Sequence, residues 1–301
     1  MVATLPHDER TATPRRSMNS MLRFLALLAC FLVGCASPAQ RIDREAMRNG
    51  LSREIATGAG FQHLIYMRAP SSTADSLTVF LEGDGIPWLG GMTPAVDPTT
   101  RQPVALRLMV QAPGPAMYVG RPCYHALRDP GCSPTLWTSA RYSARIVDSM
   151  RVAIEVKMRE LAVQRVRLVG YSGGGVLAIL IAERLANVSD VVTIAANLDT
   201  DAWTSHHGYL PLQSSLNPAR SEHPHPWREL HLQGALDTVV PPATTGAYFE
   251  RFPSAQRRVL ENHAHACCWA EDPPAIWRDV ANPSVSSDPA PSLAAPYRES
   301  R

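Results

Sequence analysis

Short runs of apolar residues alternate along the chain with longer stretches in which apolar residues recur at helical spacing. Two short runs flank Gly58 and Gly60, which predicts a hairpin. Apolar positions at four-residue steps between 140 and 161 predict an amphipathic helix. The predicted elements, in chain order, are a helix over 42–51, a hairpin over 52–68, a strand over 77–81, a helix over 104–110, a strand over 117–119, a helix over 140–161, a strand over 166–169, a helix over 176–185, strands over 191–196 and 230–232, a helix over 243–252 and a strand over 258–260.

The order of these elements predicts the fold class. Strands that alternate with helices form right-handed crossovers, so we expect an α/β protein with a mostly parallel, twisted sheet and helices on both faces. Residues 198–228 interrupt the alternation and predict an irregular, lid-like excursion. We expect a tether and an N-terminal helix over 36–50 (the tether itself 36–40), the domain over 51–281, and a disordered Pro/Ser/Ala-rich tail over 282–301.

The composition fits one enzyme-sized domain. Hydrophobic residues make up 45% and charged residues 19% of the 301 residues, which is ordinary for a globular chain. A formal net charge of +2 creates no field that would attract a nucleic acid. The sequence contains no internal repeat and no Gly-rich phosphate loop, so we expect no cofactor. The oligomeric state stays open.

The N-terminus resembles an export signal. Arg15, Arg16 and Arg23 precede the uncharged run 24–34, and a basic region followed by a short apolar run is typical of secretory signals. A bilayer span needs about 20 apolar residues, so this run is too short to cross a membrane. A twin-arginine route through Arg15 and Arg16 is a weaker alternative.

The end of this run, Leu32-Val33-Gly34-Cys35, resembles a bacterial lipobox. The resemblance implies that residues 1–35 contain the signal peptide, that Cys35 is lipidated and becomes the first mature residue, and that the protein is anchored to a membrane. Ala36 after the cysteine implies the periplasmic side of the outer membrane. The alternative is a plain cleaved signal in which Cys35 plays no part.

Four cysteines follow the signal: Cys123, Cys132, Cys267 and Cys268. An even number in an exported chain makes each of them a disulfide candidate. Cys123 and Cys132 flank a short Pro-Gly stretch, which suits a small closed loop. Cys267 and Cys268 are adjacent, where a disulfide would be strained. The sequence leaves the pairing open.

The residues Gly170-Tyr171-Ser172-Gly173-Gly174 match the G-x-S-x-G pattern, between a predicted strand and a predicted helix. That pattern is a nucleophile elbow, whose small flanking residues let the strand and the helix approach closely while the serine is held on a sharp turn. The helix N-terminus stabilises negative charge that develops there. Ser172 is therefore the candidate nucleophile, and the alternative is a Gly-rich turn with an unreactive serine.

A serine nucleophile needs a base that is oriented by a third group. In the fold that carries this elbow the order along the chain is serine, acid, histidine. Asp237, which follows the predicted strand over 230–232, is the candidate acid, with Asp199 and Asp201 as rivals. His263 and His265 both follow the last predicted strand and are candidates for the base.

The oxyanion hole requires two backbone N–H donors. Gly173, directly after the nucleophile, would supply one. We expect the other from the loop after the strand over 77–81, with Asp84 first and Gly85 second. Many lipases and esterases carry a His-Gly segment at this place, and Glu82 instead of that histidine leaves the second donor uncertain.

Together, Leu81-Glu82-Gly83-Asp84-Gly85, the elbow, Gly-x-x-Asp-x-x-Val-Pro-Pro and His-x-Cys-Cys-Trp resemble an uncharacterised, lipoprotein-type bacterial branch of the α/β-hydrolase superfamily over about residues 50–280. The resemblance implies an α/β-hydrolase fold and a serine hydrolase that cleaves a small ester or thioester. It favours His265 over His263 as the base. The cysteines 123 and 132 and the segment 136–142 also resemble features of this branch, without a chemical role.

Two other readings stay open. His263, His265 and Cys267 alternate along the chain and could place metal ligands on one face, although we expect no metal. The protein could also keep the fold as a non-catalytic envelope lipoprotein that binds a ligand or partner. The aromatic residues Trp88, Tyr171 and Trp203 suggest an apolar or aromatic substrate.

Overall fold

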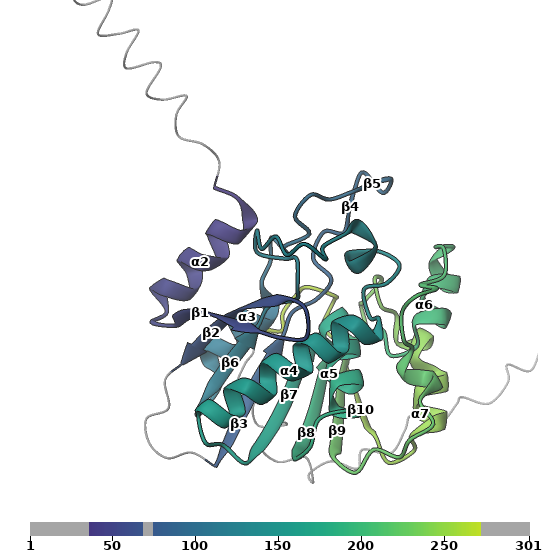
Figure 1. The fold of residues 1–301 in the computed structure, drawn as a ribbon. Helices are drawn as coiled ribbons and strands as arrows, with labels where there is room; N and C mark the ends of the chain where they lie inside the picture. The colour runs from purple at the N-terminus through teal and green to yellow at the C-terminus, as the bar shows by residue number, and fades with distance from the viewer. Residues whose placement is uncertain (1–35, 69–74, 272–301) are drawn as a thin grey trace, which may run out of the picture. The chain divides into compact units, whose positions relative to one another are not determined.

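Eight strands form one sheet in the order β1-β2-β6-β3-β7-β8-β9-β10 (Figure 1). This computed structural model describes residues 36–68 and 75–271. β2 is antiparallel to both of its neighbours, and all other neighbouring strands are parallel. The strands of the sheet are β1 (Ser52–Thr57), β2 (Gln62–Arg68), β3 (Ser76–Leu81), β6 (Ala116–Val119), β7 (Arg165–Tyr171), β8 (Val188–Ile194), β9 (Arg228–Gly234) and β10 (Gln256–Leu260).

Helices cover both faces of the sheet (Figure 1). On β3, Leu77 and Val79 point to one apolar core and Phe80 points to the other, because successive side chains of a strand face opposite ways. The first core is closed by α4 (Ala144–Glu160), α5 (Gly173–Ala182) and α7 (Gly246–Arg251), and the second by α2 (Pro38–Arg48) and α3 (Val104–Gln111). The predicted α/β class with a mostly parallel sheet is confirmed.

The remaining elements lie in the connections. They are the small hairpin of β4 (Trp88–Leu89) and β5 (Thr93–Pro94), the helix α6 (Thr200–His207), and the 3-10 turns η1 (Pro134–Trp137), η2 (Pro218–Arg220) and η3 (Pro242–Thr245). The hairpin β4–β5 was not expected, since each of its strands has only two residues.

The first helix lies earlier than expected. The tether expected over 36–40 already contains the first turn of α2, which begins at Pro38 and ends at Arg48 instead of spanning 42–51. Proline is favourable in a first helical turn, because the N–H group that it lacks would have no hydrogen-bond partner within the helix there. Ala39, Ile42 and Ala46 are buried on one side of the helix, so burial explains the earlier start.

Two helices begin at residues other than those predicted. α5 begins at Gly173 and not at Val176, so the glycines belong to the helix itself. α4 begins at Ala144 and not at 140. Residues 140–143 form a turn instead, and this turn directs side chains toward the active-site edge of the sheet, as described below.

The expectation of an irregular excursion over 198–228 is wrong in part. The segment contains the two-turn helix α6, whose first N–H groups, those of Asp201 and Ala202, donate to the side chain of Asp199. An aspartate in this position is an effective helix cap, and the polar composition of the helix hid the pattern. η2 follows in the same segment. The rest is turn and coil.

Cys123 and Cys132 form a disulfide with a Cα–Cα distance of 5.6 Å, and Cys267 and Cys268 are joined to each other. The predicted signal with Cys35, and the tail over 282–301, lie outside the described residues. Within residues 36–68 and 75–271, no helix is both long and apolar enough to span a bilayer.

Candidate active site

The predicted nucleophile lies on a sharp turn at the carboxyl edge of the sheet. Ser172 joins the end of β7 to the start of α5 with φ 51° and ψ −125°, a conformation that costs energy for a residue with a side chain. Its N–H donates to the carbonyl of Ile194 at 2.7 Å, which ties the turn to the neighbouring strand β8. The side chain is partly exposed.

Two glycines make this turn possible. A Cβ added to Gly170 would clash with the carbonyl of Gly174, and one added to Gly174 would clash with the carbonyl of Leu81. Backbone can approach backbone this closely only where no side chain intervenes. The G-x-S-x-G pattern therefore lets α5 start directly against β7 and β3.

A histidine in the loop after the last strand, β10, contacts the serine. The Nε2 atom of His265 lies 3.1 Å from Oγ of Ser172, and its Nδ1 atom lies 2.8 Å from Oδ2 of Asp237. Since Nδ1 faces a carboxylate, it carries the proton, and Nε2 accepts from the serine hydroxyl. The structure thus brings together three residues that are 65 and 28 positions apart in the sequence.

His265 and Asp237 are both held by further hydrogen bonds. The Asp237 side chain is fully buried, and its Oδ1 atom accepts from the N–H groups of Val239 and Val240. The carbonyl of His265 accepts from the Tyr171 hydroxyl at 3.0 Å and from Nε1 of Trp269 at 2.9 Å. Hydrogen bonds to the ring and to the backbone carbonyl of His265 therefore fix the orientation of the imidazole.

The loop after β3 covers the serine. A Cβ on Gly83 would lie 3.3 Å from Cβ of Ser172, so this glycine packs directly over the nucleophile. Its N–H donates to the Glu82 carboxylate, whereas the N–H groups of Asp84 and Gly173 donate to no acceptor within the described residues. Two N–H groups free to donate are what an oxyanion hole requires.

Gly85, the second-choice donor, and Glu82 have structural tasks. Gly85 has φ +67°, and a Cβ there would clash with the Pro98 carbonyl. Glu82 is buried and accepts from the N–H of Ala105 in the first turn of α3. Burial raises the pKa of Glu82 to about 7. Its carboxyl group thus caps α3 and fixes the start of the loop.

A buried ionic cluster fixes the side chain of Asp84. Oδ1 lies 2.7 Å from Nη2 of Arg121, and Oδ2 accepts from Nη1 of Arg141 at 2.8 Å and from the Tyr142 hydroxyl at 2.7 Å. Burial raises the pKa of Asp84, but the two arginines outweigh it and lower the pKa to about 2. A Cβ on Gly173 would clash with the Asp84 carboxylate, so the cluster borders the oxyanion region directly.

Comparison with solved structures identifies the architecture. An esterase from Pyrococcus furiosus superimposes with a TM-score of 0.58 at 12% identity, covering 83% of this chain and 94% of that one. A Xanthomonas campestris protein described as an α/β serine hydrolase without a lid gives 0.50 at 12%, covering 77% and 92%. A protein of unknown function from Agrobacterium tumefaciens, described as a candidate α/β hydrolase, gives 0.54 at 11%, covering 77% and 96%. The chain has the α/β-hydrolase fold.

At these identities the likeness establishes the fold alone. No family model matches the sequence, and no curated protein is similar to it. In the α/β-hydrolase fold the site described above lies at the carboxyl edge of the parallel strands, where ligands of open α/β sheets bind.

The rival residues lie elsewhere or serve the fold. Asp199 caps α6, and Asp201 pairs with Arg220. The ring of His263 packs against Trp269 with a centroid distance of 4.6 Å. Of the three aromatic residues expected to line a pocket, Tyr171 is buried and holds the His265 segment, while Nε1 of Trp203 donates to the Val239 carbonyl.

The ionic cluster around Asp84 was missed by sequence reasoning. Arg141 and Tyr142 belong to the segment 136–142, which had no assigned chemical role. A weak signal existed, since Arg141 and Tyr142 follow the apolar pair Leu136-Trp137 closely, and a charged side chain that is buried needs a partner. Arg121 follows β6 and carried no signal of its own. Within the described residues, no group of three or more His, Cys, Asp or Glu side chains is arranged to hold a metal ion.

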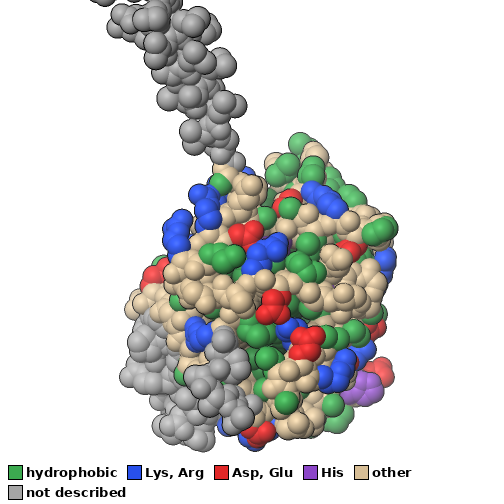
Figure 2. Space-filling view, turned by 60° about the vertical axis from the view of Figure 1, so that its left-hand side comes forward, with side chains coloured by type: hydrophobic (Ala, Val, Ile, Leu, Met, Phe, Trp, Pro, Cys, Tyr) green, Lys and Arg blue, Asp and Glu red, His purple; other side chains and the backbone are tan. Residues whose placement is uncertain are grey.

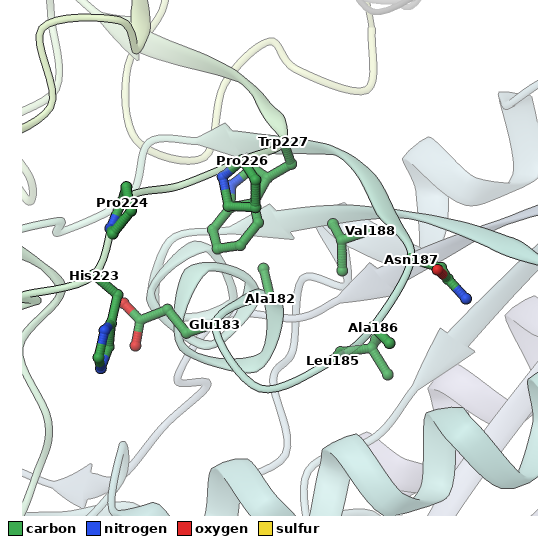
Figure 3. A pocket seen from close by; sticks show the side chains of 10 residues that line it. All are labelled: Ala182, Glu183, Leu185, Ala186, Asn187, Val188, His223, Pro224, Pro226 and Trp227. Carbon is green, nitrogen blue, oxygen red and sulfur yellow. The ribbon is translucent and has the colours of Figure 1, made fainter.

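A pocket of about 320 Å³ lies at the other end of α5 from Ser172 (Figure 3). Its lining combines apolar residues, among them Leu185, Val188 and Trp227, with the polar residues Glu183, Asn187 and His223. The pocket contains none of the candidate catalytic side chains. It therefore does not compete with the carboxyl edge as the site of chemistry.

A second buried network lies beside that pocket. His225 contacts Oε1 of Glu229 through Nδ1 at 2.5 Å and Oε1 of Glu183 through Nε2 at 3.5 Å. Its ring stacks between Trp227 and Phe252, with centroid distances of 4.6 and 4.0 Å. This network links the end of the segment 198–228 to α5 and β9.

Proposed function

We propose that the protein is a serine hydrolase that cleaves carboxylic esters or thioesters through an acyl-enzyme on Ser172. The observation that carries the proposal is the pair of contacts made by one imidazole, 3.1 Å to the Ser172 hydroxyl and 2.8 Å to the Asp237 carboxylate. A serine hydroxyl becomes a competent nucleophile when a base so oriented can take its proton.

In the first half of the reaction Oγ of Ser172 attacks the substrate carbonyl carbon, and Nε2 of His265 takes the hydroxyl proton. The negative charge that forms on the carbonyl oxygen is stabilised by the N–H groups of Gly173 and Asp84. Asp237 stabilises the imidazolium. The carbon–oxygen (or carbon–sulfur) bond then breaks, and the leaving alcohol (or thiol) receives the proton from His265.

In the second half, water takes the place of the alcohol. His265 removes a proton from water as its oxygen attacks the acyl carbon, and the bond to Ser172 breaks with return of that proton to Oγ. The products are a carboxylic acid and the regenerated serine. Glu82, buried and engaged with α3, takes no part in these transfers.

The ester class is supported by chemistry and by likeness. An ester leaving group is expelled more easily than an amine, and the Pyrococcus furiosus neighbour is described as an esterase. We also propose that the chain is exported and anchored through a lipid on Cys35 in the outer membrane, on its periplasmic side. This location is supported by the basic residues, the apolar run and the lipobox-like end of the N-terminus.

A panel of p-nitrophenyl esters of graded chain length tests the proposal. We expect wild-type protein to hydrolyse at least one ester and Ser172→Ala to lose at least about 10⁴-fold in kcat/KM. Ser205→Ala, which removes an exposed hydroxyl on α6, is the matched control and should retain wild-type rates. Inactivity of the wild type toward every ester of the panel would favour the non-catalytic lipoprotein instead.

A further inference from the structure

Exposed apolar side chains are concentrated at one edge of the molecule. Among the described residues, eleven large hydrophobic side chains are exposed, and eight of them lie in the loops after β3, β8 and β9. We call these eight the apolar rim. Its members are Trp88, Leu89, Met92, Val96, Tyr209, Leu210, Leu236 and Val239.

The most exposed members of the rim stand on both sides of the active site. Met92 is 85% and Val96 75% exposed near β4–β5, and Leu210 is 88% exposed after α6. The rim is continuous with the catalytic residues, since the N–H of Val239 donates to Asp237. Figure 2 shows hydrophobic side chains gathered at the top of the molecule, the end at which Figure 1 places β4–β5.

The described chain begins at this same end. β1 runs parallel to the central strands, because it is antiparallel to β2, which is antiparallel to β6. α2 packs on β1 and leads down to its start, so the first turn of α2 lies toward the end of the molecule that carries β4–β5, and its last turn lies lower, near the start of β1 (Figure 1). Cys35 precedes Pro38 by three residues, which span at most about 11 Å. A lipid on Cys35 therefore holds this edge close to the membrane.

Charge at the start of α2 suits an anionic lipid surface. Arg41 and Arg44 are exposed in its first two turns. The acidic residues of the helix are engaged elsewhere, Asp43 with Arg53 and Glu45 with Arg107. Basic side chains beside an anchor attract anionic headgroups.

We propose that the apolar rim docks on the phospholipid bilayer that carries the anchor, so that the edge with Ser172 faces the lipid. An anchored protein gains further binding from a second, apolar contact, whose strength grows with the apolar area buried in lipid. Eight exposed apolar side chains on one edge supply that contact, with Arg41 and Arg44 at the headgroups. The proposal rests on the predicted anchor and not on catalysis. It also gives a substrate dissolved in the bilayer a short path to the site.

Quenching of tryptophan fluorescence tests the contact. Full-length protein is reconstituted into vesicles of phosphatidylcholine and phosphatidylglycerol, with and without bromine on the acyl chains. The share of the signal due to Trp88 is the difference between wild type and Trp88→Phe. We expect brominated lipid to quench this share, and the double variant Met92→Asp/Leu210→Asp to reduce the quenching at least about threefold, because carboxylates resist burial in lipid.

Val259→Asp is the matched control, since Val259 is also an exposed apolar residue but lies on the edge strand β10, outside the rim. It should leave the quenching unchanged. Absence of Trp88-dependent quenching in the wild type overturns the proposal, as does equal quenching in the double variant. Sedimentation that finds a dimer which the double variant converts to monomers would assign the rim to a second copy and also overturn it. None of these outcomes depends on ester hydrolysis, so a result that overturns the docking proposal leaves the proposed function unaffected.

Discussion

Replacing Asp84 by asparagine removes the one carboxylate that lies between two buried guanidinium groups. The side chains of Arg121 and Arg141 are 3% and 7% exposed, so water cannot take over the role of the carboxylate. Removing one partner of a buried ion pair costs about 3–5 kcal/mol. The lowered pKa of Asp84, about 2 against an ordinary 3.8, corresponds to about 2 kcal/mol and agrees in size.

Because the folded-state pKa lies below the unfolded one, this stabilisation is complete above pH 3.8 and is lost as the pH falls through 2. At pH 7 we therefore expect Asp84→Asn to lower the thermal midpoint by about 6–20 °C, at about 2–4 °C for each kcal/mol. The gap to the wild type should narrow below pH 4. Catalysis should fall as well, since the carboxylate positions the loop that carries the Asp84 N–H.

Differential scanning calorimetry at pH 7 measures this effect. Asp75→Asn is the control, because Asp75 and Arg165 form a pair at 3.0 Å with side chains more than 60% exposed. An exposed pair contributes less than about 1 kcal/mol, so this midpoint should hardly change. If both variants shift the midpoint by the same small amount, the cluster does not hold the loop and the reasoning fails.

Three further predictions concern other parts of the molecule. Burial lowers the pKa of His225, but the nearby carboxylates of Glu229 and Glu183 outweigh this and raise the pKa to about 9. The contribution of His225 to stability is therefore complete below pH 6.5 and is lost as the pH rises through 9. Between these values the thermal midpoint of the wild type should fall more steeply than that of His225→Gln, and parallel curves would refute this. Cys132→Ser opens a short loop and should cost about 2–3 kcal/mol in urea unfolding, whereas an unchanged midpoint would contradict the disulfide's stabilising role. Asp237→Asn should lower kcat by about 10⁴-fold, while Asp201→Asn, which alters the rival acid, should keep the wild-type rate; the reverse order would exchange their roles.

The three residues of the site were predictable because their chemistry imposes a pattern on the sequence. Ser172 needs small neighbours to hold its turn, and this requirement is local, so G-x-S-x-G reveals it. Asp237 and His265 must follow late strands to reach the same edge, which restricts the candidates to a few. The local sequence does not distinguish His263 from His265, since both follow β10. The preference for His265 came from the resemblance, and the structure brings His265 to the serine.

What escaped prediction depends on contacts between distant segments. The cluster of Asp84, Arg121 and Arg141 joins loops after β3 and β6 with the turn before α4, and no periodicity encodes such a meeting. The role of Glu82 as the cap of α3 is of the same kind, since the carboxylate lies 23 residues before the N–H of Ala105 that it accepts from. The helix α6 was overlooked although Asp199 is a good cap, because its polar residues show no apolar stripe.

Covalent labelling by a fluorophosphonate shows whether His265 activates Ser172. The rate of adduct formation is followed by intact mass, and peptide mapping locates the adduct, in the wild type and in His265→Ala. We expect one adduct, on Ser172, formed at least about 10³-fold more slowly in His265→Ala. No adduct on Ser172, or one formed equally fast without the imidazole, would contradict it.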